Sequence, residues 1–238
     1  MPRNNESRLG VRKEDESSPS ENTNSLLNFV IPTEFVPIPT KGKFYPPDHP
    51  LHNVEQVEMR YMSAKETDIL TSKSLLKKGI AIDRMIESLV VDKNIKANEI
   101  FTGDKNALVV AARISGFGEN YDAHVICEEC GHKSEQSYDL SALQTKETPE
   151  DIEFSEHGTF YITLPKTGVV AECCLLTGKD EAELLRRAEK RNKMNLTDTT
   201  MTDQYKMIIV SLNGVTERSK VEEFVDVMQK MSQAPQIE

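Results

Sequence analysis

Residues 121–139 read YDAHVICEECGHKSEQSYD, and this stretch decides how the rest of the chain is organised. Apolar residues lead into a cysteine turn, and an alternating polar segment follows it. The pattern predicts two strands joined by a tight turn that holds Cys127 and Cys130. Two thiolates at positions i and i+3 before Gly131 can hold one metal ion from a single turn, because glycine permits the positive φ that the chain needs there.

The cysteine turn supplies only half of a metal site. A structural zinc ion takes four ligands, commonly with cysteines in pairs, and Cys127 and Cys130 form the one CxxC pair in the chain. His132 could be a third ligand, although its position two residues beyond Cys130 is awkward. Cys173 and Cys174 are adjacent, so in a strand they face opposite sides and only one joins easily. Zinc is thus the one cofactor suggested. Its remaining ligands could come from the same chain or from another chain. Alternatively, the turn binds no metal and its thiols are free.

The sequence predicts no catalytic or nucleotide-binding residue. Glu128 and Glu129 flank the turn thiols and should raise their pKa, which opposes cysteine–histidine catalysis. Neither HExxH nor a deaminase signature occurs. Gly178 and Lys179 resemble the end of a phosphate loop, but Cys173 occupies the position of its first glycine.

Charge placement indicates what the hairpin binds. The chain has 238 residues and a formal net charge of −10. Between Glu119 and His157 there are 11 acidic residues but only Lys133 and Lys146, a net charge of −9. Nucleic-acid contacts require the opposite sign, so we expect a basic protein partner instead. No apolar run is long enough to span a bilayer, and the first residues lack the apolar segment of a secretory signal.

The remaining pattern predicts an α+β protein in which helices pack around a small antiparallel sheet that contains the CxxC hairpin, with a disordered N-terminal tail. The chain is expected to divide as follows: a disordered tail (1–28), an extended proline-rich arm (29–53), a strand plus helical region (54–118), antiparallel hairpins with the cysteine turn (119–178), and C-terminal helices (179–238).

Several boundaries follow from local signals. Ser63 and Glu66 form a capping box at the start of a helix. A helical apolar pattern continues from residue 74 to 90 through Gly79, and another covers 200–212. Two strands at 159–164 and 169–176 predict a second hairpin, which could join the cysteine hairpin in one sheet. The arm could pack on its own domain or on a neighbouring subunit.

Several runs together resemble a known family. They are PTKGKFYPP (39–47), VEQVEMRYMSAKETDILTS (54–72), SLLKKGIAIDRMIESLV (74–90), the CxxCG hairpin, Leu164-Pro165-x-x-Gly168 and LLTGKDEAELL (175–185). Over residues 30 to 231 the chain is similar to baseplate hub proteins of T4-type contractile-tailed phages.

The resemblance implies a non-enzymatic protein of baseplate hub assembly, with other hub or tail proteins as partners. It would lie in the virion tail baseplate, or in the host cytoplasm during assembly, and it carries over no catalytic residue. The CxxC motif keeps a second hypothesis open, which is a phage zinc-ribbon regulator that binds nucleic acid or host polymerase.

Overall fold

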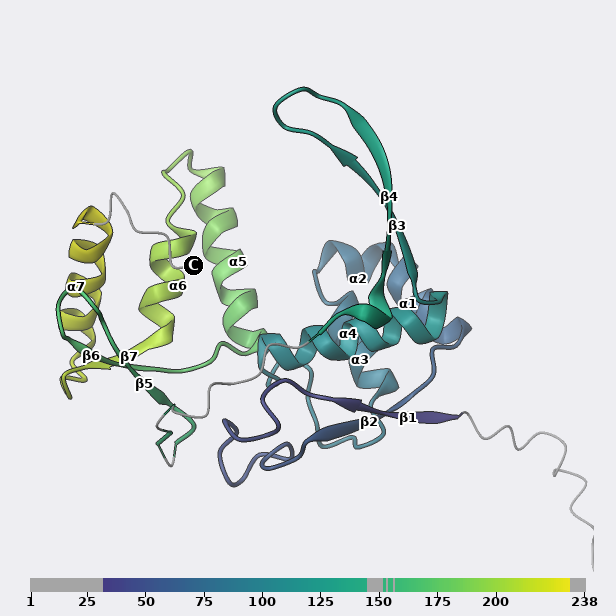
Figure 1. Ribbon diagram of the computed structural model, residues 1–238, viewed down its shortest axis with the longest axis horizontal. Helices are drawn as coiled ribbons and strands as arrows, with labels where there is room; N and C mark the ends of the chain where they lie inside the picture. Colours follow the sequence, from purple (N-terminus) through teal and green to yellow (C-terminus); the bar gives the residue numbers. More distant parts are fainter. Residues whose placement is uncertain (1–31, 145–151, 153, 156, 232–238) are drawn as a thin grey trace, which may run out of the picture. The chain divides into compact units, whose positions relative to one another are not determined.

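The computed structural model describes residues 32–144, 152, 154–155 and 157–231, coloured in Figure 1. The chain divides into two units, 1–31 and 32–238, and every element below belongs to the second. The predicted tail at 1–28 lies outside the described residues, as does most of the acidic loop after residue 144. None of the described helices is long and apolar enough to cross a membrane.

The predicted α+β class is confirmed. The described helices are α1 (Ala64–Thr71), α2 (Lys73–Lys77), α3 (Ala81–Leu89), α4 (Thr102–Phe117), α5 (Gly178–Lys193), α6 (Thr200–Ile208) and α7 (Arg218–Met231). The strands are β1 (Thr33–Pro37), β2 (Gln56–Arg60), β3 (Asn120–Ile126), β4 (Lys133–Asp139), β5 (Phe160–Thr163), β6 (Val170–Cys173) and β7 (Ile209–Leu212).

The strands form three separate antiparallel sheets, so the expectation of one sheet that includes the cysteine hairpin is wrong. Strand β1 pairs with β2, β3 pairs with β4, and β5, β6 and β7 form a three-stranded sheet in that order. The residues of β3 and β4 are exposed apart from the half-buried Ala123 and Ser134, so this hairpin buries little surface against the rest of the described chain. Strand β7 takes the place beside β6.

Two expected helices are shorter than their apolar patterns suggested. The run from residue 74 to 90 breaks at Gly79, whose φ of +69° ends α2 before α3 begins. The predicted helix at 200–212 ends at Ile208, and the last four residues form β7. There Ser211 pairs with Glu172 of β6, because tertiary pairing outweighs the weak helical preference of β-branched residues.

The arm packs on its own domain. Strand β1 runs antiparallel to β2, and a turn follows in which Gly42 has a φ of +74°. A side chain at Gly42 would meet the backbone nitrogen of Val54 at 2.3 Å, so this turn needs glycine. The aromatic side chains of Phe44 and Tyr45 are buried. The arm thereby joins one core with α1, α3 and α4, whose fully buried members include Leu51, Met59, Ile86, Leu89, Ile100 and Leu108.

Asp104 ties the arm to the first turn of α4. Its side chain is fully buried and accepts hydrogen bonds from the Thr40 backbone N–H (3.0 Å), the Thr40 hydroxyl (2.6 Å) and the Tyr45 hydroxyl (2.8 Å). The Tyr45 oxygen in turn accepts from the Phe101 backbone N–H at 3.1 Å. Burial, together with the nearby Asp104 charge, raises the pKa of Tyr45 far above its usual value. Each polar atom of this buried cluster is therefore satisfied by another.

A second apolar cluster lies between the three-stranded sheet and α7. Its buried members are Ala171, Cys173, Ile209, Leu212, Val221 and Val225. Backbone hydrogen bonds join this part of the chain to the segment before α4. Thr102 donates to the Leu176 carbonyl (2.9 Å), and Gly178 donates to the Ile100 carbonyl (3.0 Å). The capping box of Thr177 and Asp180 then begins α5.

Replacing Asp104 with alanine should destabilise the protein severely. Two hydroxyls and one backbone N–H would lose their acceptor in a buried site, so we expect Asp104→Ala to lower the free energy of unfolding by about 3 kcal/mol. Tyr45→Phe, which keeps the ring, should cost about 1 kcal/mol. Urea denaturation measures both. Asp68→Ala on the exposed face of α1 is the control. An Asp104→Ala protein as stable as this control would contradict the assignment.

Glu172 gives the three-stranded sheet a dependence on pH. Its carboxylate accepts hydrogen bonds from the hydroxyls of Ser211 (2.7 Å) and Thr159 (2.7 Å), and these bonds hold its pKa below the usual value of 4.5. A depressed folded-state pKa contributes stability that is present above pH 4.5 and is lost as pH falls through the folded-state pKa. We therefore expect Glu172→Gln to flatten the acid limb of the unfolding free energy. Chemical denaturation from pH 7 to pH 3 measures it, and an unchanged acid limb would contradict this role.

Candidate interaction surface at the cysteine hairpin

The hairpin of β3 and β4 has two different faces. Residues opposite each other across an antiparallel pair share a face, and successive residues alternate. Tyr121 pairs with Tyr138 and Val125 pairs with Ser134, which makes one face aromatic and apolar. The other face is mostly polar, with three acidic side chains and one lysine, and its pairs are Asn120 with Asp139, Asp122 with Ser137, His124 with Glu135, and the apolar Ile126 with Lys133.

Both faces of the hairpin are open to solvent in the described part of the chain. Every residue of the two strands is exposed except Ala123 and Ser134, which are half-buried. Tyr121 and Tyr138 are each 47% exposed. Figure 1 shows β3 and β4 extending together from the end of α4 to the turn. A two-stranded hairpin is at best marginally stable alone in water, so this ribbon is suited to pack against a partner.

Arg113 of α4 anchors the root of the hairpin. Its guanidinium donates to the carbonyls of Gly118 (2.9 Å) and Asn120 (3.2 Å). The same group lies over the rings of Phe117 and Tyr121, with its central carbon 5.1 Å and 5.8 Å from their centroids. These contacts span the helix end and the first residues of β3. No local sequence pattern marks Arg113, because its partners are carbonyls and rings that the turn at Gly118 brings together.

Cys127 and Cys130 lie at the exposed tip of the hairpin. The Cys127 N–H donates to the His132 carbonyl (2.9 Å), and the Gly131 N–H donates to the Cys127 carbonyl (2.9 Å), so the turn is closed on itself. The backbone N–H groups of Cys130 and Glu129 donate to the Cys127 sulfur and lower the pKa of that thiol. The expectation that flanking glutamates raise this pKa is therefore wrong for Cys127, because the shift comes chiefly from hydrogen bonds to the sulfur.

Of the other suggested ligands, Cys173 lies in another sheet, Cys174 directly follows it, and His132 lies beside the turn. Cys173 is buried in β6, where burial raises the pKa of its thiol to about 11. Cys174 follows it, and its thiol donates to the Met207 carbonyl at 3.4 Å. His132 is exposed beside the turn. Within the described ranges, no three cysteine, histidine or acidic side chains are placed to hold one metal ion. Of the four cysteines, Cys127 and Cys130 are the pair that lies at this tip.

A groove of about 770 Å³ lies elsewhere in the fold and is mainly apolar. Its walls come from the arm, the start of α4, β5, α5 and α6, with Phe44, Phe101, Phe160, Leu184, Leu185 and Ile208 among the residues that line it. Glu181 and Cys174 are the ionisable side chains among its described lining residues. Two such groups in an apolar wall do not make a convergent catalytic set.

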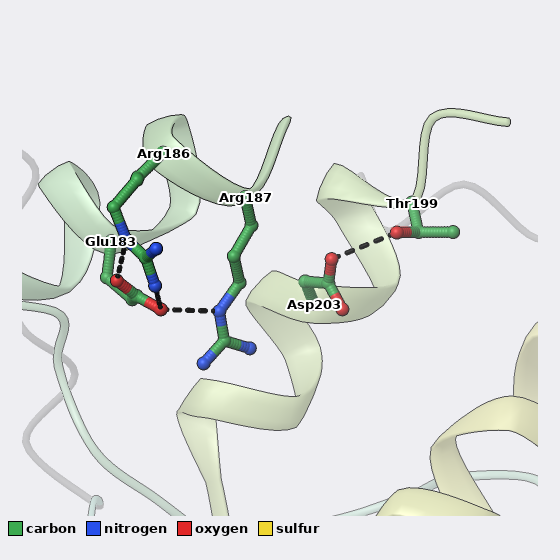
Figure 2. Close-up of polar contacts among 5 residues, drawn as sticks. All are labelled: Glu183, Arg186, Arg187, Thr199 and Asp203. Atoms are coloured by element: carbon green, nitrogen blue, oxygen red, sulfur yellow. Dashed lines mark hydrogen bonds and ion pairs between the residues drawn. The ribbon is translucent and has the colours of Figure 1, made fainter. Parts of the chain in front are cut away.

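The polar side chains on α5 and α6 pair locally, as Figure 2 shows. Glu183 accepts from the Nε atoms of Arg186 (2.7 Å) and Arg187 (2.8 Å), which lowers the pKa of Glu183 to about 2. At the start of α6 the Thr199 hydroxyl donates to Asp203 at 2.9 Å. Exposed pairs at this spacing support a helix weakly and need no ligand.

These features define a protein that presents an exposed two-faced hairpin from a helical domain. The family described as T4 bacteriophage base plate protein matches residues 37–233, and the chain belongs to that family. It is therefore a structural protein of the phage tail baseplate, with other phage tail proteins as its partners. A search of curated proteins found no significant match, and neither did a search of solved structures.

Removing the Arg113 side chain should loosen the hairpin without unfolding the domain. We expect Arg113→Ala to speed amide hydrogen exchange in β3 and β4 by about tenfold, which corresponds to about 1.4 kcal/mol of local stability. Exchange in α3 and β2 should change little. Arg84→Ala, which removes an exposed arginine that pairs within α3, is the matched control. Equal exchange rates in both variants would show that the root contacts do not hold the hairpin.

Proposed function

We propose that this protein is a structural or assembly component of the baseplate hub and acts through protein–protein contacts without catalysing a reaction. Family membership supports the baseplate location. The single observation that supports the mode of action is the β3–β4 hairpin, which offers an aromatic face and an acidic face to solvent. Burying an aromatic side chain such as Tyr138, which is 47% exposed, against another protein contributes favourably to the free energy of binding.

Charge indicates the chemistry of the partner. Residues 119–139 contain six acidic side chains and one lysine, a net charge of −5. A partner that presents lysine and arginine around an apolar patch would match both faces, and opposite charges would speed and orient docking. The same charge opposes contact with phosphates, so a zinc-ribbon regulator that binds nucleic acid has less support.

The apolar groove is consistent with the same proposal. A hydrolase or transferase site requires a nucleophile, a base and a group that stabilises developing charge, held near one another. The lining of the groove offers Glu181 and a Cys174 thiol whose pKa is raised, chiefly by burial. A thiol with a raised pKa is a poor nucleophile at neutral pH.

Reversing charge on the acidic face should weaken binding to neighbouring tail proteins. We expect Asp122→Lys with Glu135→Lys to reduce recovery of baseplate proteins with the tagged chain at least tenfold, and to weaken its dependence on salt. Asp68→Lys with Glu189→Lys makes the same charge change on exposed helix surfaces and serves as the control.

A second measurement tests the proposed role itself. Phages that lack this chain should produce few assembled, infectious tails. Full infectivity without it would refute the assembly role, whereas loss of binding in both charge-reversed variants would refute only the assignment to the hairpin.

A further inference from the structure

We propose that Cys127 and Cys130 bind a thiophilic divalent cation, Zn²⁺, which is shared between the hairpin tips of two copies of this chain. This inference goes beyond the proposed function and does not rest on it. Each chain would supply two thiolates, so that two copies complete a four-cysteine tetrahedral site.

The geometry of the turn supports the ligand pair. Gly131 has a φ of +67°, and its N–H closes the turn onto the Cys127 carbonyl at 2.9 Å. Cys127 and Cys130 are both exposed in this closed turn, three residues apart. Backbone N–H groups that point at a sulfur stabilise a metal-bound thiolate. The tip thus has the sulfur donors and the supporting hydrogen bonds of half a zinc site.

The missing ligands do not come from the described residues of the same chain. Cys173 lies in the core of the three-stranded sheet, 5% exposed. Cys174 is directed at the Met207 carbonyl. The described residues bring no third cysteine, histidine or carboxylate into range of a metal ion at the tip. Among the described residues a tetrahedral ion at the tip thus has two protein ligands, and a second molecule can supply the other two.

A second copy of the chain fits this requirement best. Two identical tips related by a two-fold axis give four equivalent sulfur ligands with no further residue type. The tips also carry Glu128 and Glu129, so two tips repel each other when no cation lies between them. Pairing should consequently depend on the metal. Each thiol releases its proton on binding, so that one ion frees four protons from two chains and binding weakens as pH falls.

Titration of the full-length protein with Zn²⁺, in the presence of a reductant that does not bind the metal, tests this inference. We expect half an ion per chain at saturation, with conversion from monomer to dimer by light scattering and reversal by a chelator. Substituting Co²⁺ should give the sulfur-to-metal absorption and the visible bands of a tetrahedral four-thiolate site. The probes are the metal ions alone, and no partner protein is needed.

Variants locate the site. Cys127→Ser with Cys130→Ser should abolish metal uptake and dimer formation, and the fold should persist because both side chains are exposed. Cys174→Ser and His132→Gln are matched controls that should retain half an ion per chain. One ion per chain on a monomer would overturn the shared site, as would uptake that needs a partner protein. No uptake, or uptake that survives the double substitution, would overturn the metal site altogether.

Discussion

The buried carboxylate of Asp104 is the constraint on which the first half of the structure depends. It takes three hydrogen bonds from two residues of the arm and lies in the first turn of α4, where a negative charge favours the helix. These three donors are buried, and each would be left without a partner if the carboxylate were absent. With the arm fixed, Leu51 and Met59 complete the core against α3 and α4.

The core around α4 holds the base of the exposed β3–β4 hairpin. Helix α4 carries Asp104 at one end and Arg113 near the other, so the element that closes the core also anchors the hairpin root. The hairpin itself has no described element covering either face. The residues that stabilise the core are therefore different from the exposed residues of the hairpin, an arrangement that suits a subunit of a larger assembly.

Much of the secondary structure could be predicted from local signals, because those signals act within a few residues. The Ser63–Glu66 box and the C-terminal helix α7 follow from short-range hydrogen bonds or from periodicity. Prediction failed at Gly79, where a left-handed φ of +69° ends α2, and at Ile209, where pairing with β6 replaces helix. The expected rise in the pKa of the Cys127 thiol was wrong because hydrogen bonds to its sulfur, chiefly from backbone N–H groups, lower that pKa.

The sequence by itself determined the α+β class, the cysteine turn and the acidic charge around it, because composition and spacing are properties of the chain before it folds. Only the tertiary structure decided that the cysteine hairpin forms its own sheet with both faces exposed. It alone also placed Cys173 in a separate core and joined Asp104 to Thr40 and Tyr45. These are contacts between residues tens of positions apart, and their free energy depends on burial and geometry that no local pattern specifies.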